Sequence, residues 1–352
     1  KQSTKRKSLI AKKKVHKKIL SYLKNKEFRK IYNNFDKFLN ERNINTFVVS
    51  LSGGSDSMAM AYFSKCHQIL NNSKIYYIHI DHKLRKHSSN EARKLKYFMK
   101  KFDINCEILS WKKNKNVRGT QENARIARYN LLENFCKRKK ITSLFLAHHI
   151  DDLYENFFIR MLRGSGIRGL TSFSSTDTVI SCKLKSYRPF LSLSKNSLLN
   201  VTNKVFGYFI KDPSNSNNEF LRIRIRSLLS NFQKDGFDKK KFNLTYCNLQ
   251  SANETLKFYT NQNILKNTSF FKKNNKNSII INSNFFMQPN EIVLRSFSSL
   301  ISKINRSYYF SRGKTLIKKI EEIRLNSFKK ATVGGCIVER VKNTITNLKE
   351  KF

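Results

Sequence analysis

The chain has 352 residues, 39% of them hydrophobic, which is enough for two domains with cores of their own. Its 70 Lys and Arg residues against 24 Asp and Glu residues give a formal net charge of +46, which predicts a nucleic-acid partner, although AT-rich coding accounts for part of the excess. The six cysteines form no C-x-x-C pair and no run of about eighteen apolar residues exists, which excludes a zinc ribbon, a disulfide framework and a membrane span and favours a cytoplasm-like compartment.

A basic arm occupies the start of the chain. Residues 1–26 contain eleven Lys or Arg residues and no acidic residue. The segment is rich in Lys rather than Arg and lacks a long apolar stretch, which disfavours a secretory signal and leaves an organelle transit remnant as a weak alternative. We expect this arm to contact RNA phosphates. Apolar residues at helical spacing predict a helix over residues 29–39, and we assign residues 1–40 to the arm and this helix.

Strands and helices then alternate. Apolar runs predict strands over residues 47–51, 75–80, 106–109 and 143–147, and helical patterns lie between and after them over residues 57–70, 90–102, 121–137 and 152–163. This order predicts an α/β fold with a doubly wound parallel sheet, whose ligand crevice lies at the carboxyl ends of the strands. We assign residues 41–225 to this domain.

The pattern of apolar strands alternating with helices ends before the last third of the chain. Loop-forming residues at 212–218 interrupt the alternation, and we place a domain boundary near residue 225. Residues 226–352 are predicted to form a smaller, helix-rich, basic region whose charge predicts binding to nucleic acid. Its expected elements are a helical stretch over 232–270, a short strand over 279–281, a helix over 291–304, and from 314 onward a basic helix, a turn at 332–336 and a charged tail.

The segment Ser52-Gly53-Gly54-Ser55-Asp56-Ser57 joins the first predicted strand to its helix. Backbone N–H groups at a helix start have no intrahelical partner and lie at the positive end of the dipole, so small residues there can surround a phosphate. The loop lacks a Gly-Lys-Ser/Thr ending, so a nucleotide triphosphate is held differently than in the common P-loop. The alternative is a Ser/Gly turn in which Asp56 only caps the helix.

Two pairs of polar residues follow in the predicted crevice. Asp81 and Ser88 come after the second strand, where ordinary helix-start residues are an equal alternative to a functional role. Arg125 and Arg128 stand three apart on one helical face, so both can address one anionic group, or they form a solvated charge pair.

A third cluster begins where the fourth strand ends. Asp152 and Glu155 stand three apart at a helix start and share a face, where they can hold Mg²⁺ or a cationic amine. The alternative is capping of the helix dipole. His148 and His149 are adjacent, point to different sides and have no third soft ligand nearby, which argues against a zinc site. The alternating residues Arg222, Arg224 and Arg226 can line a binding face, or they form an exposed strand.

Six motifs occur in a fixed order between residues 45 and 226. They are Ser52 to Ser57, Asp81-His82-x-Leu84-Arg85-x-x-Ser88-x-x-Glu91-Ala92, Gly119-x-Gln121-x-x-Ala124-Arg125-x-x-Arg128-Tyr129, His148-His149-x-Asp151-Asp152-x-x-Glu155, Arg163-Gly164-Ser165-Gly166 and Asp212-x-Ser214-Asn215. In order and spacing this set resembles the tRNA(Ile)-lysidine synthetases, members of the N-type ATP pyrophosphatases or PP-loop family. The turn at 332–336 is similar to a short signature of that family. One departure is Arg222-Ile223-Arg224, where the family usually has Arg-Asn.

The resemblance implies a HUP-like PP-loop fold and an ATP-dependent ligation. ATP adenylates the C2 oxygen of the wobble cytidine in a tRNA(Ile) with a CAU anticodon and releases pyrophosphate, after which free L-lysine displaces AMP. ATP and Mg²⁺ are the implied cofactors. The implied partners are that tRNA and L-lysine, with a homodimer left open, in the cytoplasm or in an organelle stroma or matrix.

The resemblance also implies residue roles. The residues implied to bind the nucleotide phosphates are Ser52, Gly53, Gly54, Ser55, Asp56, Ser57, Arg125 and Arg128. Asp56 and Asp152 are implied to bind Mg²⁺. The residues implied to bind the lysine substrate are Asp152, Glu155 and Arg222. The implied catalytic residues are Asp56, His148, Asp152 and Glu155. The alternatives are a tRNA cytidine thiolase of the same superfamily, which the lack of paired cysteines disfavours, and a catalytically inactive, nucleotide-dependent RNA-binding protein.

Overall fold

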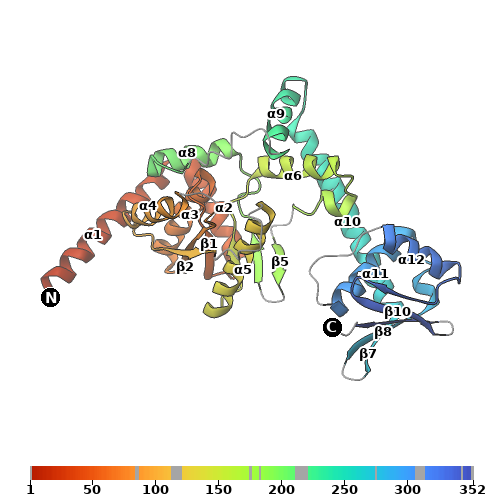
Figure 1. Cartoon of the computed structure of the whole chain (residues 1–352). Helices are drawn as coiled ribbons and strands as arrows, with labels where there is room; N and C mark the ends of the chain where they lie inside the picture. The colour runs from red at the N-terminus through yellow and green to blue at the C-terminus, as the bar shows by residue number, and fades with distance from the viewer. Residues whose placement is uncertain are drawn as a thin grey trace. The chain divides into compact units, whose positions relative to one another are not determined.

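The computed structural model describes residues 2–83, 87–111, 121–173, 177–181, 184–210, 221–273, 276–305, 314–341 and 344–349. The chain forms two compact units, Lys1–Phe237 and Asp238–Phe352 (Figure 1). The boundary expected near residue 225 lies inside helix α9 (Leu221–Lys234), so the first unit extends through this helix. None of the described helices combines the length and the apolar composition that crossing a lipid bilayer requires.

The first unit is built on a six-stranded sheet. Its strands are β1 (Thr46–Ser50), β2 (Lys74–Asp81), β3 (Cys106–Ser110), β4 (Ser143–Phe145), β5 (Asp177–Ser181) and β6 (Leu184–Tyr187). Their order is β3-β2-β1-β4-β6-β5, and only the edge pair of β5 and β6 is antiparallel. This confirms the predicted doubly wound parallel sheet. Because β2 and β4 lie on opposite sides of β1, the carboxyl ends of β1 and β4 form a switch point, where such sheets bind ligands.

Helices cover both faces of this sheet (Figure 1). The described helices of the first unit are α1 (Gln2–Ser21), η1 (Tyr22–Lys24), α2 (Lys26–Asn40), α3 (Ser55–Asn71), α4 (Ser88–Lys100), α5 (Gln121–Lys139), α6 (Ile150–Leu162), α7 (Ile167–Leu170), α8 (Lys195–Phe206) and α9, of which α6 and α9 lie away from the sheet. Phe47 and Val49 of β1 pack into one core with α2, α3, α4 and α8, whereas Val48 packs into a second core with Leu132 and Phe135 of α5. Successive side chains of a strand point to opposite faces, so one apolar strand supplies both cores.

The second unit combines helices with an antiparallel five-stranded sheet. Its described elements are α10 (Lys239–Asn267), β7 (Thr268–Lys273), β8 (Lys276–Ile281), η3 (Ser283–Phe285), α11 (Asn290–Asn305), α12 (Lys314–Arg324), β9 (Lys330–Val333), β10 (Cys336–Val341) and β11 (Thr344–Lys349). The strand order is β7-β8-β11-β10-β9. Helices α10 and α11 and strand β8 coincide with predicted elements.

The predicted charged tail was wrong, because β10 and β11 occupy that part of the chain. Cys336 and Val338 of β10 are buried, while Glu339 and Arg340 are only partly buried, so the charges did not prevent strand formation. Gly334 and Gly335 both have positive φ, at 57° and 73°, and join β9 to β10. Two consecutive residues with positive φ fit a tight hairpin turn, which explains the glycine pair.

A buried ion pair fixes α1 to the rest of the first unit. Lys65 of α3 is only 4% exposed, and its ammonium lies 2.7 Å from Oδ2 of Asp103 and 2.7 Å from the Asp103 carbonyl oxygen. His16 of α1 places Nε2 2.8 Å from the same Oδ2. Burial tends to raise the pKa of Asp103, but hydrogen bonds from Lys65 and His16 outweigh it and lower that pKa.

We predict that Asp103→Asn lowers the free energy of unfolding of the first unit by roughly 1–3 kcal/mol at neutral pH, because buried Lys65 loses its counter-charge. Asn tolerates the positive φ of residue 103, which is 54°, so the variant isolates the charge. A carboxyl group with a lowered native pKa stabilises the fold fully above its unfolded pKa of about 3.9, so the difference from the wild type should shrink as the pH falls below that value and vanish once the pH is below the lowered native pKa of Asp103.

Urea unfolding followed by fluorescence of Trp111, the only tryptophan, measures this effect. The control is Asp235→Asn, which removes an exposed carboxylate from the same unit. A pH-independent difference for Asp103→Asn would contradict the electrostatic origin.

Candidate active site at the switch point

The loop between β1 and α3 is shaped by its own hydroxyl groups. The side-chain oxygen of Ser57 accepts hydrogen bonds from the N–H groups of Ser52 and Gly53, each at 3.1 Å, and donates to the carbonyl of Gly54 at 2.9 Å. Gly53 has a φ of +89°, which favours glycine, and its carbonyl accepts a hydrogen bond from the N–H of Ile210 at 2.8 Å. The loop conformation is therefore preorganised.

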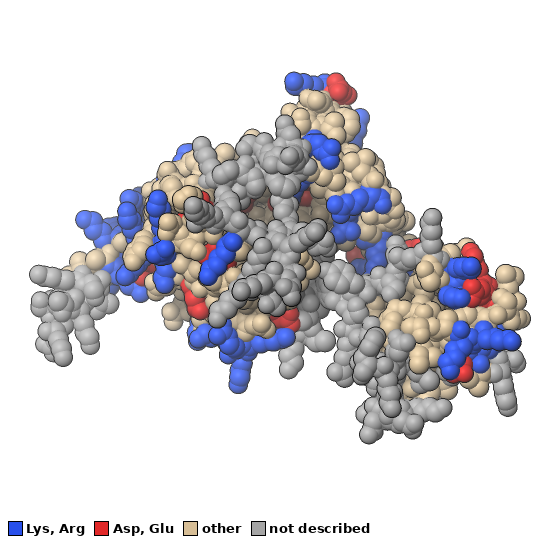
Figure 2. All heavy atoms as spheres, in the orientation of Figure 1, with Lys and Arg blue, Asp and Glu red and all other residues tan. Residues whose placement is uncertain are grey.

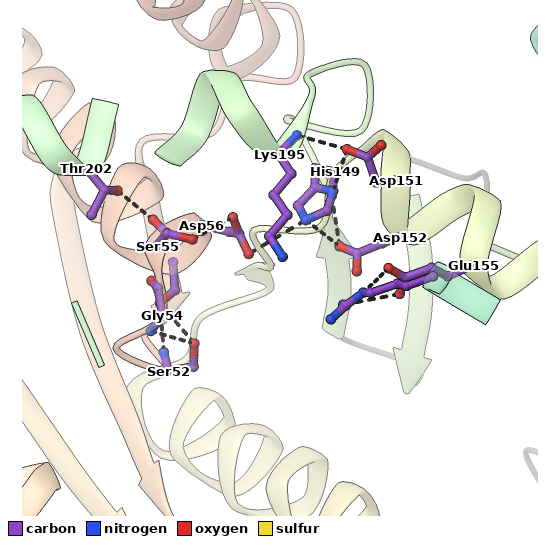
Figure 3. A network of polar contacts seen from close by, with 12 residues as sticks. Ser52, Gly54, Ser55, Asp56, His149, Asp151, Asp152, Glu155, Lys195 and Thr202 are labelled. Carbon is purple, nitrogen blue, oxygen red and sulfur yellow. Dashed lines mark hydrogen bonds and ion pairs between the residues drawn. The ribbon is translucent and has the colours of Figure 1, made fainter. Parts of the chain in front are cut away.

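The first turn of α3 offers free N–H groups. The backbone N–H groups of Ser55, Asp56 and Ser57 donate no hydrogen bond to any of the described residues. The side chain of Thr202 in α8 donates to the carbonyl of Ser55 at 2.7 Å and ties this turn to the neighbouring helix (Figure 3). Three N–H groups at the positive end of a helix form a site for an anion such as a phosphate.

A cavity of about 480 Å³ lies beside this loop, at the carboxyl ends of β1 and β2. It collects predicted site residues from two of the motifs and from helix α9. These are Ser52, Gly54, Asp56, Arg128 and Arg222. The volume and the polar lining suit a nucleotide-sized ligand.

Asp81 also lines the cavity, but the structure favours a local role for its side chain. It is 3% exposed and accepts hydrogen bonds from the Lys83 N–H at 3.0 Å and from the hydroxyls of Ser88 at 2.8 Å and Ser89 at 2.6 Å. Burial tends to raise the pKa of Asp81, yet these hydrogen bonds lower it overall. Asp81 thus orders the start of α4, which agrees with its interpretation as an ordinary helix-start residue.

His149, which the sequence analysis did not select, joins two predicted site residues. Its imidazole is 2% exposed, and Nε2 lies 3.6 Å from Oδ2 of Asp56 and 3.5 Å from Oδ2 of Asp152 (Figure 3). Nδ1 lies 3.7 Å from Oδ2 of Asp151. Burial works against the charged form, but the surrounding carboxylates raise the pKa of His149. The surrounding carboxylates therefore favour the protonated form of this imidazole, which lies between the phosphate loop and the start of α6.

Asp152 and Glu155 share a face, as their spacing predicted, and both are engaged by arginines of α9. Arg222 pairs with Asp152 at 2.5 Å and also with Glu155, and Arg226 pairs with Glu155. Glu155 is 2% exposed. Burial raises the pKa of Asp152 despite the opposing effects of His149 and Arg222. Arg226, which the sequence analysis placed with Arg222 and Arg224 on a possible binding face, lies one helical turn after Arg222 in helix α9, so the alternative of an exposed strand was wrong.

Arg125 and Arg128 lie on α5 with their guanidinium groups 5.6 Å from the ring of Tyr129. Arg125 is exposed, whereas Arg128 is half-buried and lines the cavity. Burial lowers the pKa of Arg128, and the positive charges of Arg125 and Arg222 add to this effect. Arg128 is therefore the better placed of the two to meet a phosphate.

His148 points to a different set of neighbours from His149. Its Nδ1 accepts a hydrogen bond from Nε of Arg188 at 3.0 Å. Burial lowers the pKa of His148 well below its usual range, and four surrounding arginines contribute. His148 is consequently neutral at physiological pH.

Several motif positions lie outside the described residues. They are Leu84, Arg85, Gly119, Asp212, Ser214 and Asn215. In the part of the chain that the structure covers, no group of three or more His, Cys, Asp or Glu side chains is arranged to hold a metal ion. The predicted Mg²⁺ ligands Asp56 and Asp152 both approach Nε2 of His149, so their carboxylates converge on one point.

A family model of the PP-loop domain matches residues 27–232. The match covers more than half of the chain, which therefore belongs to the PP-loop family of nucleotide-binding proteins.

More particularly, the chain is 36% identical to the tRNA(Ile)-lysidine synthase of Orientia tsutsugamushi over 182 residues, 51% of this chain and 40% of that protein. It is 34% identical to the tRNA(Ile)-lysidine synthase of Zymomonas mobilis over 184 residues, 51% of this chain and 54% of that protein. With the Rickettsia typhi enzyme of the same name, 26% identity extends over 326 residues, 92% of this chain and 74% of that one. The alignments with the first two relatives thus span about half of their lengths.

The fold is similar to that of the U34-tRNA thiolase NcsA from Methanococcus maripaludis, a structure that contains a 4Fe-4S cluster. The TM-score is 0.50 at 16% identity, covering 59% of this chain and 73% of the thiolase. At this identity the similarity concerns the fold alone.

We predict that Gly53→Ala destabilises the first unit by about 1–3 kcal/mol, whereas Gly54→Ala has little effect on its stability. An added Cβ at Gly53 would lie 2.7 Å from Cδ1 of Ile210 at a φ of +89°. At Gly54 the nearest atom is Oγ of Ser52 at 3.6 Å, an ordinary contact. Urea unfolding monitored at Trp111 compares the two variants, and equal stabilities would contradict the assignment of strain to Gly53.

Proposed function

We propose that this protein is an ATP-dependent ligase that joins L-lysine to C2 of the wobble cytidine in a tRNA(Ile) with a CAU anticodon. In the first step the C2 oxygen of the cytidine attacks the α-phosphorus of ATP, and pyrophosphate leaves. In the second step an amine of lysine attacks C2, loses a proton, and AMP leaves. The observation that supports this proposal is that His149 joins a helix-start phosphate site, through Asp56, to a buried pair of carboxylates, through Asp152.

The phosphate side of the crevice suits a departing pyrophosphate. The free N–H groups of Ser55, Asp56 and Ser57 would stabilise its negative charge. Arg128, which lines the same cavity, would approach the α-phosphate. These groups act on the bond between the α- and β-phosphates, so the expected nucleotide product is AMP.

The carboxylates of Asp56 and Asp152 fit a Mg²⁺ ion. Both point toward Nε2 of His149, and carboxylate oxygens are ligands that Mg²⁺ takes together with substrate phosphates. When bound, the ion would neutralise charge that develops on the phosphates. The cation that holds these carboxylates together in the structure is His149.

The acidic pair Asp152 and Glu155 suits the ammonium group of lysine. In the structure the guanidinium groups of Arg222 and Arg226 fill this position, so binding of lysine exchanges one cation for another. Arg222 would then be released to meet the carboxylate of the amino acid. A free lysine amine has a pKa near 10.4, so a carboxylate of this pair would accept its proton before attack.

The charge of the protein suits a tRNA substrate. Lys and Arg side chains are spread over the face of each unit shown in Figure 2, with few acidic groups among them. Exposed lysines of α1 and the basic second unit are the proposed phosphate contacts. An anticodon loop also presents its wobble base at a lower unstacking cost than a duplex does. The proposed setting is the cytoplasm or an organelle interior.

The decisive assay supplies purified protein with tRNA(Ile), ATP and radiolabelled lysine. We expect lysine incorporation at the wobble position with AMP and pyrophosphate as products. Incorporation of sulfur from a labelled donor in place of lysine would identify a thiolase, and neither incorporation would identify an inactive RNA-binding protein. ADP and orthophosphate as products would contradict the assignment of the phosphate loop.

We predict that Glu155→Gln lowers lysine transfer about 10²- to 10⁴-fold, because the amine loses a charged partner, while formation of pyrophosphate persists. Steady-state kinetics with varied lysine measure the first effect, and pyrophosphate release in the absence of lysine measures the second. Glu41→Gln is the matched control, because Glu41 is exposed and distant in sequence from the motifs. Equal loss of both activities in Glu155→Gln would assign Glu155 to the nucleotide step instead.

A further inference from the structure

Arg188 occupies a buried position beside His148. It directly follows β6 and is 5% exposed. Strands β4 and β6 are parallel neighbours, and the Leu146 N–H donates to the Tyr187 carbonyl at 2.9 Å, so the residues just beyond both strands lie close together. From this position Nε of Arg188 donates a hydrogen bond to Nδ1 of His148 at 3.0 Å.

Phe173 holds both side chains in place. The guanidinium carbon of Arg188 lies 5.1 Å from the centre of the Phe173 ring, a cation–π distance. The same ring packs edge-on against the imidazole of His148, with centroids 5.0 Å apart. A lysine at position 188 would keep the charge but would lack both the Nε–H group and the planar surface.

The hydrogen bond between Arg188 and His148 has only one direction. The Nε–H group of an arginine can only donate a hydrogen bond, because arginine has no acceptor atom. Nδ1 of His148 must therefore be the acceptor and carries no proton. The imidazole is then neutral, with its proton on Nε2. Arg125 and Arg128 of α5 and Arg222 of α9 surround the same ring and disfavour a second proton. Nε2 of His148 makes no hydrogen bond to any described residue.

We propose that Arg188 is a positioning residue that holds His148 as a neutral imidazole with its proton on Nε2. His148 then donates a hydrogen bond from Nε2 to an anionic oxygen of the bound nucleotide during adenylate formation, and it acts neither as a general acid nor as a general base. This role rests on the proposed function, whereas the tautomer itself is a property of the protein without substrates.

Nuclear magnetic resonance of the full chain, labelled with nitrogen-15 histidine, tests the tautomer directly. The chain has seven histidines, and His148→Gln identifies the signals of His148 by their loss. We expect the wild-type His148 signals to show protonated Nε2 and bare Nδ1, and to stay neutral as the pH is lowered to about 5.5, a full unit below the ordinary histidine pKa. A protonated Nδ1, or titration near the ordinary pKa, would overturn the proposal whether or not the protein is a lysidine synthetase.

Kinetics of Arg188→Met and Arg188→Lys test the consequence for the reaction. In Arg188→Met the hydrogen bond that keeps Nδ1 bare is lost, so the pKa of His148 should rise, although burial and the three remaining arginines still oppose a second proton. The acid limb of pyrophosphate release, which falls about tenfold per pH unit, should therefore begin at a higher pH than in the wild type. Near pH 8, where His148 is neutral in both proteins, the loss should be only about 2- to 10-fold. Arg188→Lys retains the positive charge and should keep the wild-type pH profile with a lowered rate, because the orientation is lost.

Arg138→Met is the matched control, since it removes an exposed arginine at the far end of α5. Circular dichroism and urea unfolding establish that the Arg188 variants fold. If folded Arg188→Met shows the tautomer and the pH profile of the wild type, Arg188 does not position His148. If the tautomer changes while pyrophosphate release does not, the structural part holds and the role of His148 in adenylate formation is refuted.

Discussion

The charged contact of His149 with Asp56 and Asp152 connects the two halves of the candidate site. Asp56 belongs to the first turn of α3 and Asp152 to the first turn of α6, so a single imidazole joins the phosphate loop after β1 to the acidic helix after β4. The ring is 2% exposed, and a charge at that depth is tolerated only beside opposite charges. Burial destabilises an unpaired charge, but it also strengthens the attraction between the imidazolium and the two carboxylates, because water does not screen it. The two ends of the switch point are thereby held at a fixed separation.

Charge compensation divides the crevice into two poles. Asp152 and Glu155 are neutralised by Arg222 and Arg226 within the chain itself. Arg128 has no carboxylate partner among the residues that the structure describes, and it shares its cavity with the phosphate loop. The uncompensated pole is therefore positive and suits phosphates, whereas the compensated pole can exchange an internal cation for an external one. A nucleotide and an amine can thus occupy one crevice without competing for the same groups.

The sequence predicted the sheet of the first unit better than the contacts within the site. Strands such as residues 47–51 are short apolar runs between helical patterns, and such local signals survive folding. Asp56, Asp152 and Glu155 were found because carboxylates at helix starts are recognisable in sequence. His149 was given no role, and Arg226 was given only a place on a possible binding face, because their contacts depend on which side chains they face, and that is set by tertiary packing. The strands of the second unit were largely missed for a related reason, since β11 pairs with β8 across more than sixty intervening residues.

The two consecutive histidines show how packing assigns different charges to one residue type. His148 and His149 start from the same intrinsic pKa and share one backbone segment, yet their side chains leave it in different directions. His149 meets Asp56, Asp151 and Asp152 and holds its proton, whereas His148 meets Arg188 and gives its proton up. The charged ring can bridge carboxylates, and the neutral ring can donate a hydrogen bond to a phosphoryl oxygen without adding a charge that Arg128 already supplies. An exchange of the two environments would exchange the charges of the two rings, because the surrounding side chains set each pKa. The charges of the two rings therefore depend on the arginines around His148 and the carboxylates around His149, and not on the histidines alone.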